Sequence, residues 1–204
     1  MNNAIPGKIH NVITTAIKEM VRVVLSGAGF TTKNWMPSAS LEEQEMKVAA
    51  QIEFYKKTAA TEGGIAGLGG IFTGIAEFPV LLAMKIKLLF DIAAIYGFDV
   101  NDYKERLYIL YVFQLAFSSA QRRSEVYRRL QNWNEYARDL PNDPQHFDWR
   151  TFQQEYRDYI DLAKLAQLLP FIGAFVGIMV NYQLLHKLGE TAMYAYRMRL
   201  LDKN

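Results

Sequence analysis

Residues 62–99 read EGGIAGLGGIFTGIAEFPVLLAMKIKLLFDIAAIYGFD, and this stretch decides the fold of the chain. Its glycines recur at i, i+4, i+7 and i+11, so on one α-helix they fall within an arc of about 60°. A helix with a bare stripe lets another backbone approach closely, as in close helix pairs. The stretch therefore predicts a helix built for tight packing, with a stripe made of Gly63, Gly67, Gly70 and Gly74.

Pro79 interrupts this glycine pattern. The residue before a proline is pushed out of the α region, and proline suits a first helical turn. The sequence therefore predicts a second helix that starts near Pro79 and ends near Tyr96. Its ionisable side chains, Lys85, Lys87 and Asp91, with Glu77 if the helix extends backwards, share an arc of about 160°.

Three interpretations stay open for these four side chains. They can form a solvated stripe on an otherwise buried helix. They can instead form a buried cluster, because charges in so apolar a segment must be paired to be tolerated. They can also form an acid–base site, since perturbed carboxylates can mark function. We predict that Glu77, Lys87 and Asp91 form one partly buried network.

A second small-residue stripe follows Pro170, with Gly173, Gly177 and Asn181 at i, i+4 and i+8. We predict that it packs against the first stripe, where the asparagine can hydrogen-bond across the crossing. His186 and Glu190 then stand at i, i+4, a spacing that can place two ligands on one metal. The chain has three histidines, so a metal would need Glu77 or Asp91 as well, and a paired polar face is favoured over a metal site.

The remaining periodic segments have a helical period of 3.6, and none shows sustained two-residue alternation. Helices are expected over residues 8–26, 41–61 and 149–168, with capping boxes at Ser40–Glu43 and Asp102–Glu105. The apolar residues 107–117 indicate a central helix. The fold class is therefore all-α: a single-domain bundle of about seven helices over residues 1–204, with the two glycine-faced apolar segments packed together. Residues 1–39 form an N-terminal amphipathic helix and loop, and residues 139–148 a loop that can serve as a lid or insertion.

Composition excludes several classes of protein. Half of the 204 residues are hydrophobic and 22% are charged, which excludes disorder. The net charge of +2 gives no argument for nucleic-acid binding. Because there is no cysteine, there is neither a disulfide framework nor a thiolate metal site. No Walker loop, dinucleotide fingerprint, nucleophile elbow or zincin motif occurs, so no catalytic residue, metal or cofactor is predicted.

The apolar N-terminal residues are interrupted by charges, so no secretory signal is expected and the protein is placed inside the cell. Residues 63–84 are long enough to span a bilayer but contain Glu77 and Pro79. An interfacial or buried helical hairpin is therefore favoured over a transmembrane span.

Residues 76–79, AEFP, lie before a long helix that ends in residues 92–99, IAAIYGFD. Together with residues 189–192, GETA, and 196–199, YRMR, they resemble the signature of the EcsC family of bacterial proteins, over about residues 40–201. The chain departs from the family pattern at position 77, where the family has aspartate. It also departs at Lys87, where arginine is more frequent and would provide a bidentate fork.

The resemblance implies a transporter partner, because the family's namesake is encoded beside an ABC transporter, and it implies no established biochemical activity. We therefore expect a cytoplasmic protein, peripheral to the inner membrane, that binds a lipid or apolar ligand or an integral partner such as an ABC transporter, without nucleic acid. The alternative is a hydrolase-type enzyme with a carboxylate and lysine cluster in a helical pocket. The candidate functional polar residues are Glu77, Lys87, Asp91, Asn181, His186 and Glu190.

Overall fold

The computed structural model describes residues 7–26, 40–66, 71–161 and 173–202, together with Thr32, Trp35 and Leu165. Within these ranges, side chains are described except at 7–9, 60–66, 71–77, 144, 149, 153 and 173–178. This part of the chain is all-helical, as predicted, and contains no strand, only an isolated bridge between Ser118 and Ile160. Its eight α-helices are α1 (Gly7–Ser26), α2 (Leu41–Ala66), α3 (Ile71–Ile95), α4 (Tyr103–Phe117), α5 (Ala120–Gln131), α6 (Trp133–Asp139), α7 (Trp149–Tyr159) and α9 (Gly173–Leu201).

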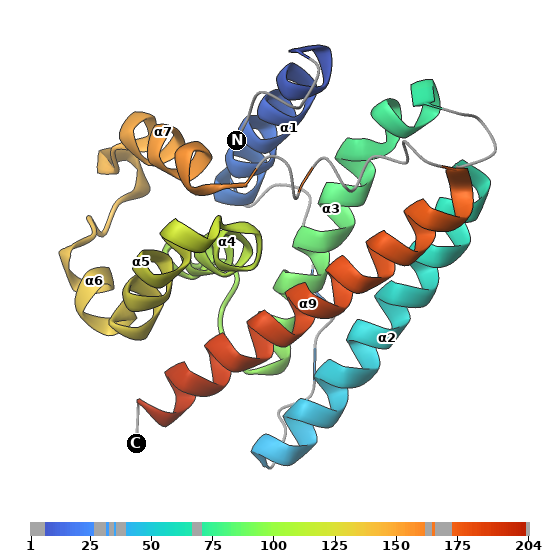
Figure 1. Cartoon of the computed structure of the whole chain (residues 1–204). Coiled ribbons are helices and arrows are strands. Elements are labelled where there is room, and N and C mark those ends of the chain that lie inside the picture. The colour runs from blue at the N-terminus through green and yellow to red at the C-terminus, as the bar shows by residue number, and fades with distance from the viewer. Residues whose placement is uncertain are drawn as a thin grey trace.

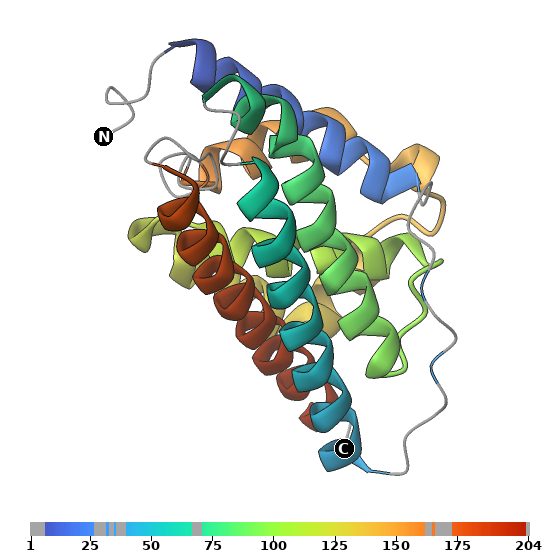
Figure 2. The same ribbon diagram turned by 90° about the vertical axis from the view of Figure 1, so that its right-hand side faces the viewer.

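The three longest helices, α2, α3 and α9, pack side by side and form one layer of the bundle (Figures 1 and 2). Helix α4 lies behind this layer and contacts α1, α3, α5 and α9. Twelve of its fifteen residues are buried, which confirms the prediction of a central helix. Helix α5 follows α4 and also packs against α9, so α9 connects the layer of long helices to the second half of the bundle.

Two predicted helix boundaries in the glycine-rich stretch are wrong. Helix α2 continues past Gly63 to Ala66, and α3 starts at Ile71 and runs through Pro79. The glycines of the first stripe are therefore divided between helices instead of lining one helix; Gly67 and Gly70 lie outside the described residues. A proline inside a helix costs about 3 kcal/mol, and the burial of Phe78, Leu82 and Ile86 next to it on α3 offsets part of this cost.

The helices that carry the outer glycines, α2 and α3 for the first stripe and α9 for the second, do pack on one another. What the glycines at 63, 74, 173 and 177 contact lies outside the described side chains. The packing of one glycine stripe on the other therefore stays a prediction.

The C-terminal boundary predicted for the helix over residues 149–168 is also wrong. Helix α7 stops at Tyr159 because Ile160 adopts an extended conformation, with φ −78° and ψ 130°. Extended residues after α7 pair with the end of α4, where the Asp161 amide donates to the Phe117 carbonyl at 3.0 Å. The loop predicted over residues 139–148 is present between α6 and α7, with one 3-10 turn at Pro144–His146.

Helix starts follow the capping signals in part. The Ser40 hydroxyl accepts a hydrogen bond from the Glu43 amide at 3.2 Å, as the predicted capping box requires. Asp102 caps α4 by accepting from the Lys104 amide at 3.0 Å. Its predicted partner Glu105 instead points into the core and is 3% exposed, so the second half of that box is wrong.

Gly189 marks a close approach of α9 to α2. A Cβ atom at this position would lie 2.5 Å from both Cδ1 and Cγ1 of Ile52, which is itself buried. No carbon atom is tolerated that close to another, so the absence of a side chain at Gly189 allows the two helices to pack at this distance.

Replacing Gly189 with leucine is expected to lower the free energy of unfolding by about 1 to 3 kcal/mol, because it overpacks this crossing. Urea unfolding would measure the loss. Ile52→Ala makes space for the new side chain, so the double variant should lose less free energy of unfolding than the sum of the two single variants. Strictly additive losses would show that the two residues do not press on each other.

Candidate functional site

Asp91 is the centre of a buried polar set between α2 and α3. Its carboxylate accepts hydrogen bonds from Gln51 Nε2 at 3.1 Å and from the Tyr55 hydroxyl at 2.8 Å, and it forms an ion pair with the Lys87 ammonium. The carboxylate side chain is 4% exposed. Lys87 and Asp91 therefore form the partly buried pair that the sequence predicts, whereas the side chain of Glu77 lies outside the described residues.

The pKa of Tyr55, one of the partners of Asp91, lies far above its usual range. Burial of the phenol is the main cause, and the hydrogen bond to Asp91 adds to it. Tyr55 is therefore a neutral donor at any ordinary pH. Both carboxylate oxygens of Asp91 already accept a hydrogen bond, so this polar set serves to stabilise the contact between α2 and α3.

The side chain of Lys85 contacts α9 instead of α2. Its ammonium is fully buried and donates to the Oδ1 atom of Asn181 on α9. Burial lowers the pKa of Lys85 to about 7. The sequence pattern placed Lys85 on the same helical face as Lys87 and Asp91. It placed Asn181 on the second small-residue stripe, and it did not predict that Lys85 and Asn181 pair. Asn181 does hydrogen-bond to another helix, through Lys85 of α3, while the crossing of the two glycine stripes stays a prediction.

The buried lysine makes the stability of the protein dependent on pH. An unfolded chain holds a lysine proton up to a pKa near 10.4, so between about pH 7 and that value the unfolded state binds more protons. The free energy of unfolding should therefore rise with pH in this range, by up to about 1.4 kcal/mol per pH unit. Replacing Lys85 with methionine should remove this slope in unfolding curves recorded from pH 7 to 9. Parallel profiles for both proteins would contradict the assignment.

His186 and Glu190 form an exposed pair on α9, with 3.4 Å between Nε2 and Oε1 and half of each side chain in solvent. Within the residues that the structure describes, no group of three His, Cys, Asp or Glu side chains could hold a metal ion. The described candidates thus separate into three sets, which are Lys87 with Asp91, Asn181 with Lys85, and His186 with Glu190.

Glu105 is the centre of a second buried polar set, which sequence reasoning missed. Its carboxylate accepts from the Tyr196 hydroxyl at 2.7 Å and from Arg199 Nη1 at 2.5 Å. Burial raises the pKa of Glu105, and Arg199 opposes this shift. The Arg199 guanidinium also lies over the rings of Phe98 and Tyr108, 4.2 and 4.5 Å from their centroids. The signal available in the sequence was the pair Tyr196 and Arg199, one turn apart in an apolar segment.

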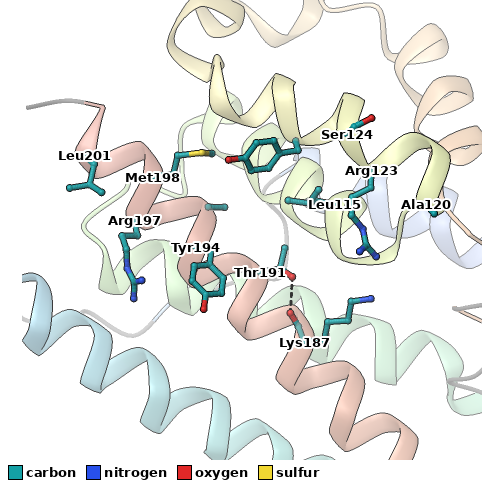
Figure 3. A pocket seen from close by; sticks show the side chains of 12 residues that line it. Leu115, Ala120, Arg123, Ser124, Lys187, Thr191, Tyr194, Arg197, Met198 and Leu201 are labelled. Carbon is teal, nitrogen blue, oxygen red and sulfur yellow. Dashed lines mark hydrogen bonds between the residues drawn. The ribbon is translucent and has the colours of Figure 1, made fainter.

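A groove of about 810 Å³ lies between α5 and α9. Figure 3 shows it from close by, with side chains of both helices along its length. Its lining is mainly apolar or aromatic, three of the twelve described lining residues are cations, and none of the twelve is acidic. We call it the α5–α9 groove; it is lined by Leu115, Ala120, Arg123, Ser124, Tyr127, Lys187, Thr191, Tyr194, Ala195, Arg197, Met198 and Leu201.

The polar candidates whose side chains the structure describes lie outside the α5–α9 groove: its lining residues do not include Lys87, Asp91, Asn181, His186 or Glu190. Sequence reasoning did not identify this groove, because its two walls come from segments about 70 residues apart along the chain. No helix among the described residues is both long enough and apolar enough to cross a lipid bilayer.

Comparison with known proteins gives one family. The model of the EcsC protein family matches residues 1–201. Protein EcsC of Bacillus subtilis is 47% identical over 204 residues, which cover all of this chain and 84% of that protein. The uncharacterized protein YdbA of the same organism is 31% identical over 141 residues, which cover 69% of this chain and 52% of that protein. No solved structure matches.

Proposed function

The chain belongs to the EcsC protein family, and we propose on that premise that it is a binding protein peripheral to the inner face of the cell membrane. Its ligand is a lipid or another apolar molecule, held in the α5–α9 groove. The observation that carries this proposal is the groove itself, which is large, apolar along its walls and open to solvent.

The size and surface of the groove support a ligand site. Its volume of about 810 Å³ lies within the range of small-molecule sites, about 300 to 1,000 Å³. Tyr127, Tyr194 and Leu201 line it and are 46%, 63% and 62% exposed. Large apolar side chains that gather at one exposed place mark a surface that is covered during function.

The contacts of the polar candidates favour binding over the hydrolase-type alternative. Asp91 is held by three donors and Lys85 is fully buried, so neither is placed as a reacting group at a ligand surface. An integral membrane partner such as an ABC transporter is the part of the proposal that rests on the family resemblance alone.

Fractionation of the native cell tests the location. We expect the protein in the membrane fraction at low salt, and we expect Leu201→Glu to move it toward the high-salt soluble fraction. Met46→Glu is the matched control, because Met46 is equally exposed, at 61%, but does not line the groove. Recovery of the unaltered protein wholly in the soluble fraction, without lipid and without a cross-linked membrane partner, would overturn the proposal.

A further inference from the structure

A pocket of about 480 Å³ lies between α1 and α7. We propose that this pocket binds the phosphate group of a phosphate monoester, held by cations of both helices. The inference does not rest on the proposed function, because the pocket shares no described lining residue with the α5–α9 groove. We call it the α1–α7 pocket; it is lined by Thr14, Ile17, Lys18, Val21, Arg150, Gln154 and Arg157.

Each helix lines the α1–α7 pocket with one face. Helices α1 and α7 pack against each other (Figures 1 and 2). On α7, Arg150, Gln154 and Arg157 stand at i, i+4 and i+7, so they fall within an arc of about 60°. On α1, Thr14 and Lys18 stand at i, i+4 and share one side of that helix. Polar side chains from both helices therefore line the same space.

The base of the pocket is apolar and its cations are exposed. Ile17 and Val21 are 2% and 1% exposed, so they lie on the inner side of the pocket. Lys18, Arg150 and Arg157 are all exposed. An anion that enters from solvent can therefore meet these cations without the large desolvation cost of a buried ion.

The charge of the pocket favours an anion. Three of its seven described lining residues are cations, and none of the seven is acidic. Lys18 forms no ion pair within the described part of the chain. Its acidic neighbour in the sequence, Glu19, pairs instead with Arg22 at 2.8 Å. The ammonium of Lys18 is therefore available to a ligand.

The two arginines of α7 are compensated only in part. Arg157 Nε lies 3.6 Å from the Asp158 carboxylate, which is beyond hydrogen-bond distance. Asp148 accepts from the Thr151 amide at 3.1 Å and from the Thr151 hydroxyl at 2.7 Å. These bonds are the main cause of the lowered pKa of Asp148, and Arg150 adds to it. Both guanidinium groups therefore keep N–H donors for an anion.

Two uncharged side chains add hydrogen-bond donors. Gln154 contributes an amide N–H₂ group. The Thr14 hydroxyl is shielded from solvent and has no hydrogen-bond partner among the described residues. Threonine in a helix has two accessible χ1 rotamers, so rotation about χ1 can turn this hydroxyl toward a ligand. An acceptor that reaches it would satisfy a group that is otherwise unpaired.

A phosphate monoester matches these donors better than a singly charged anion does. It carries a charge of about −1.5 to −2 at neutral pH, against three cations. Arginine binds phosphate through two parallel N–H groups, and lysine binds it as a point charge. A phosphate at the level of Gln154 lies within about 6 Å of Arg150 and of Arg157 along the helix axis. The volume of about 480 Å³ leaves room for the organic part of the ester.

Calorimetric titration of the full chain with two matched anions tests the inference. Methyl phosphate and methyl sulfate have the same shape, but near neutral pH the phosphate carries close to two charges and the sulfate carries one. We expect methyl phosphate to bind at least about tenfold more tightly, the factor that corresponds to one added charge-assisted hydrogen bond.

Vesicles distinguish a lipid head group from a soluble phosphate. Phosphatidylcholine vesicles with added phosphatidate present a phosphate monoester, whereas vesicles with phosphatidylglycerol at the same total charge present only diesters. Binding to the phosphatidate vesicles at least about tenfold tighter than to methyl phosphate would assign the monoester to a lipid. Comparable or weaker binding to these vesicles would assign it to a soluble molecule.

A double variant locates the site. Combined Arg150→Gln and Arg157→Gln should weaken the binding of the monoester about tenfold or more. Combined Arg123→Gln and Arg128→Gln is the matched control, because it removes the same charge from two exposed arginines of α5 that do not line the α1–α7 pocket. The control should bind the monoester as the unaltered protein does.

Three results would overturn the inference. Equal binding of the two methyl esters, together with equal binding of the two kinds of vesicle, would exclude a preference for a phosphate monoester. Equal losses in the pocket variant and in the control variant would show attraction to the overall charge of the protein instead of a site. Absence of binding of every probe would exclude the site altogether, and the proposed function of the α5–α9 groove would stand.

Discussion

Replacing Asp91 with alanine is expected to lower the free energy of unfolding by about 2 to 4 kcal/mol, because a hydrogen bond to a charged group contributes about 1.5 to 3 kcal/mol and this carboxylate accepts from Gln51 and Tyr55. The change leaves the Lys87 ammonium without its carboxylate and removes the acceptor of Gln51 and Tyr55. Because these donors belong to α2 and α3, the loss weakens the contact between two long helices. Urea unfolding followed by circular dichroism measures it.

The exposed pair on α9 is the control for this prediction. Glu190→Ala removes a carboxylate whose histidine partner is half in solvent, so its effect should stay below about 1 kcal/mol. Equal losses for Asp91→Ala and Glu190→Ala would mean that the Asp91 set is solvated, the first interpretation that the sequence allowed.

Replacing Arg199 with methionine is expected to cost about 3 to 5 kcal/mol near neutral pH, because Glu105 stays buried without its cation. Methionine retains much of the apolar contact with Phe98 and Tyr108, so the change isolates the charge. Without Arg199, burial is opposed by the hydrogen bond from Tyr196 and no longer by the cation, so the pKa of Glu105 rises further above its value in the unfolded chain.

The sign of the pH dependence follows from this shift. A carboxyl whose pKa is raised in the folded state is best tolerated when protonated, so the variant should recover stability as the pH falls. We expect the difference from the unaltered protein to be smaller at pH 5 than at pH 8. Arg197→Met is the matched control, because its pair with Glu45 is about a third exposed. A deficit independent of pH would show that Glu105 does not carry a buried charge.

Much of the fold could be predicted from local patterns. The apolar period of α1 and the apolar residues of α4 indicated helices that the structure contains. The boundary at Pro79 could not be predicted, because the local preference of proline was outweighed by apolar burial along α3. The end of α7 depends on a bridge from Ile160 to Ser118, a contact between distant residues that no local pattern reports.

The polar sets were only half predictable, for a geometric reason. A shared helical face places Lys85, Lys87 and Asp91 within one arc, but α3 has neighbours on two sides. Lys85 therefore meets α9, while Lys87 and Asp91 lie against α2. Glu105 has the spacing of a capping residue, and burial against Arg199 outweighs that role. The α5–α9 groove depends on which helices pack together, which the sequence did not specify.

We propose above that the α5–α9 groove holds a lipid or other apolar ligand. Native mass spectrometry, with lipid extraction, on protein purified without detergent from the cell that makes it tests this claim most directly. We expect a bound lipid on the unaltered protein and on Met46→Glu, and its loss from Leu201→Glu. A mass equal to that of the bare chain for all three proteins, with no lipid in the extracts, would contradict it.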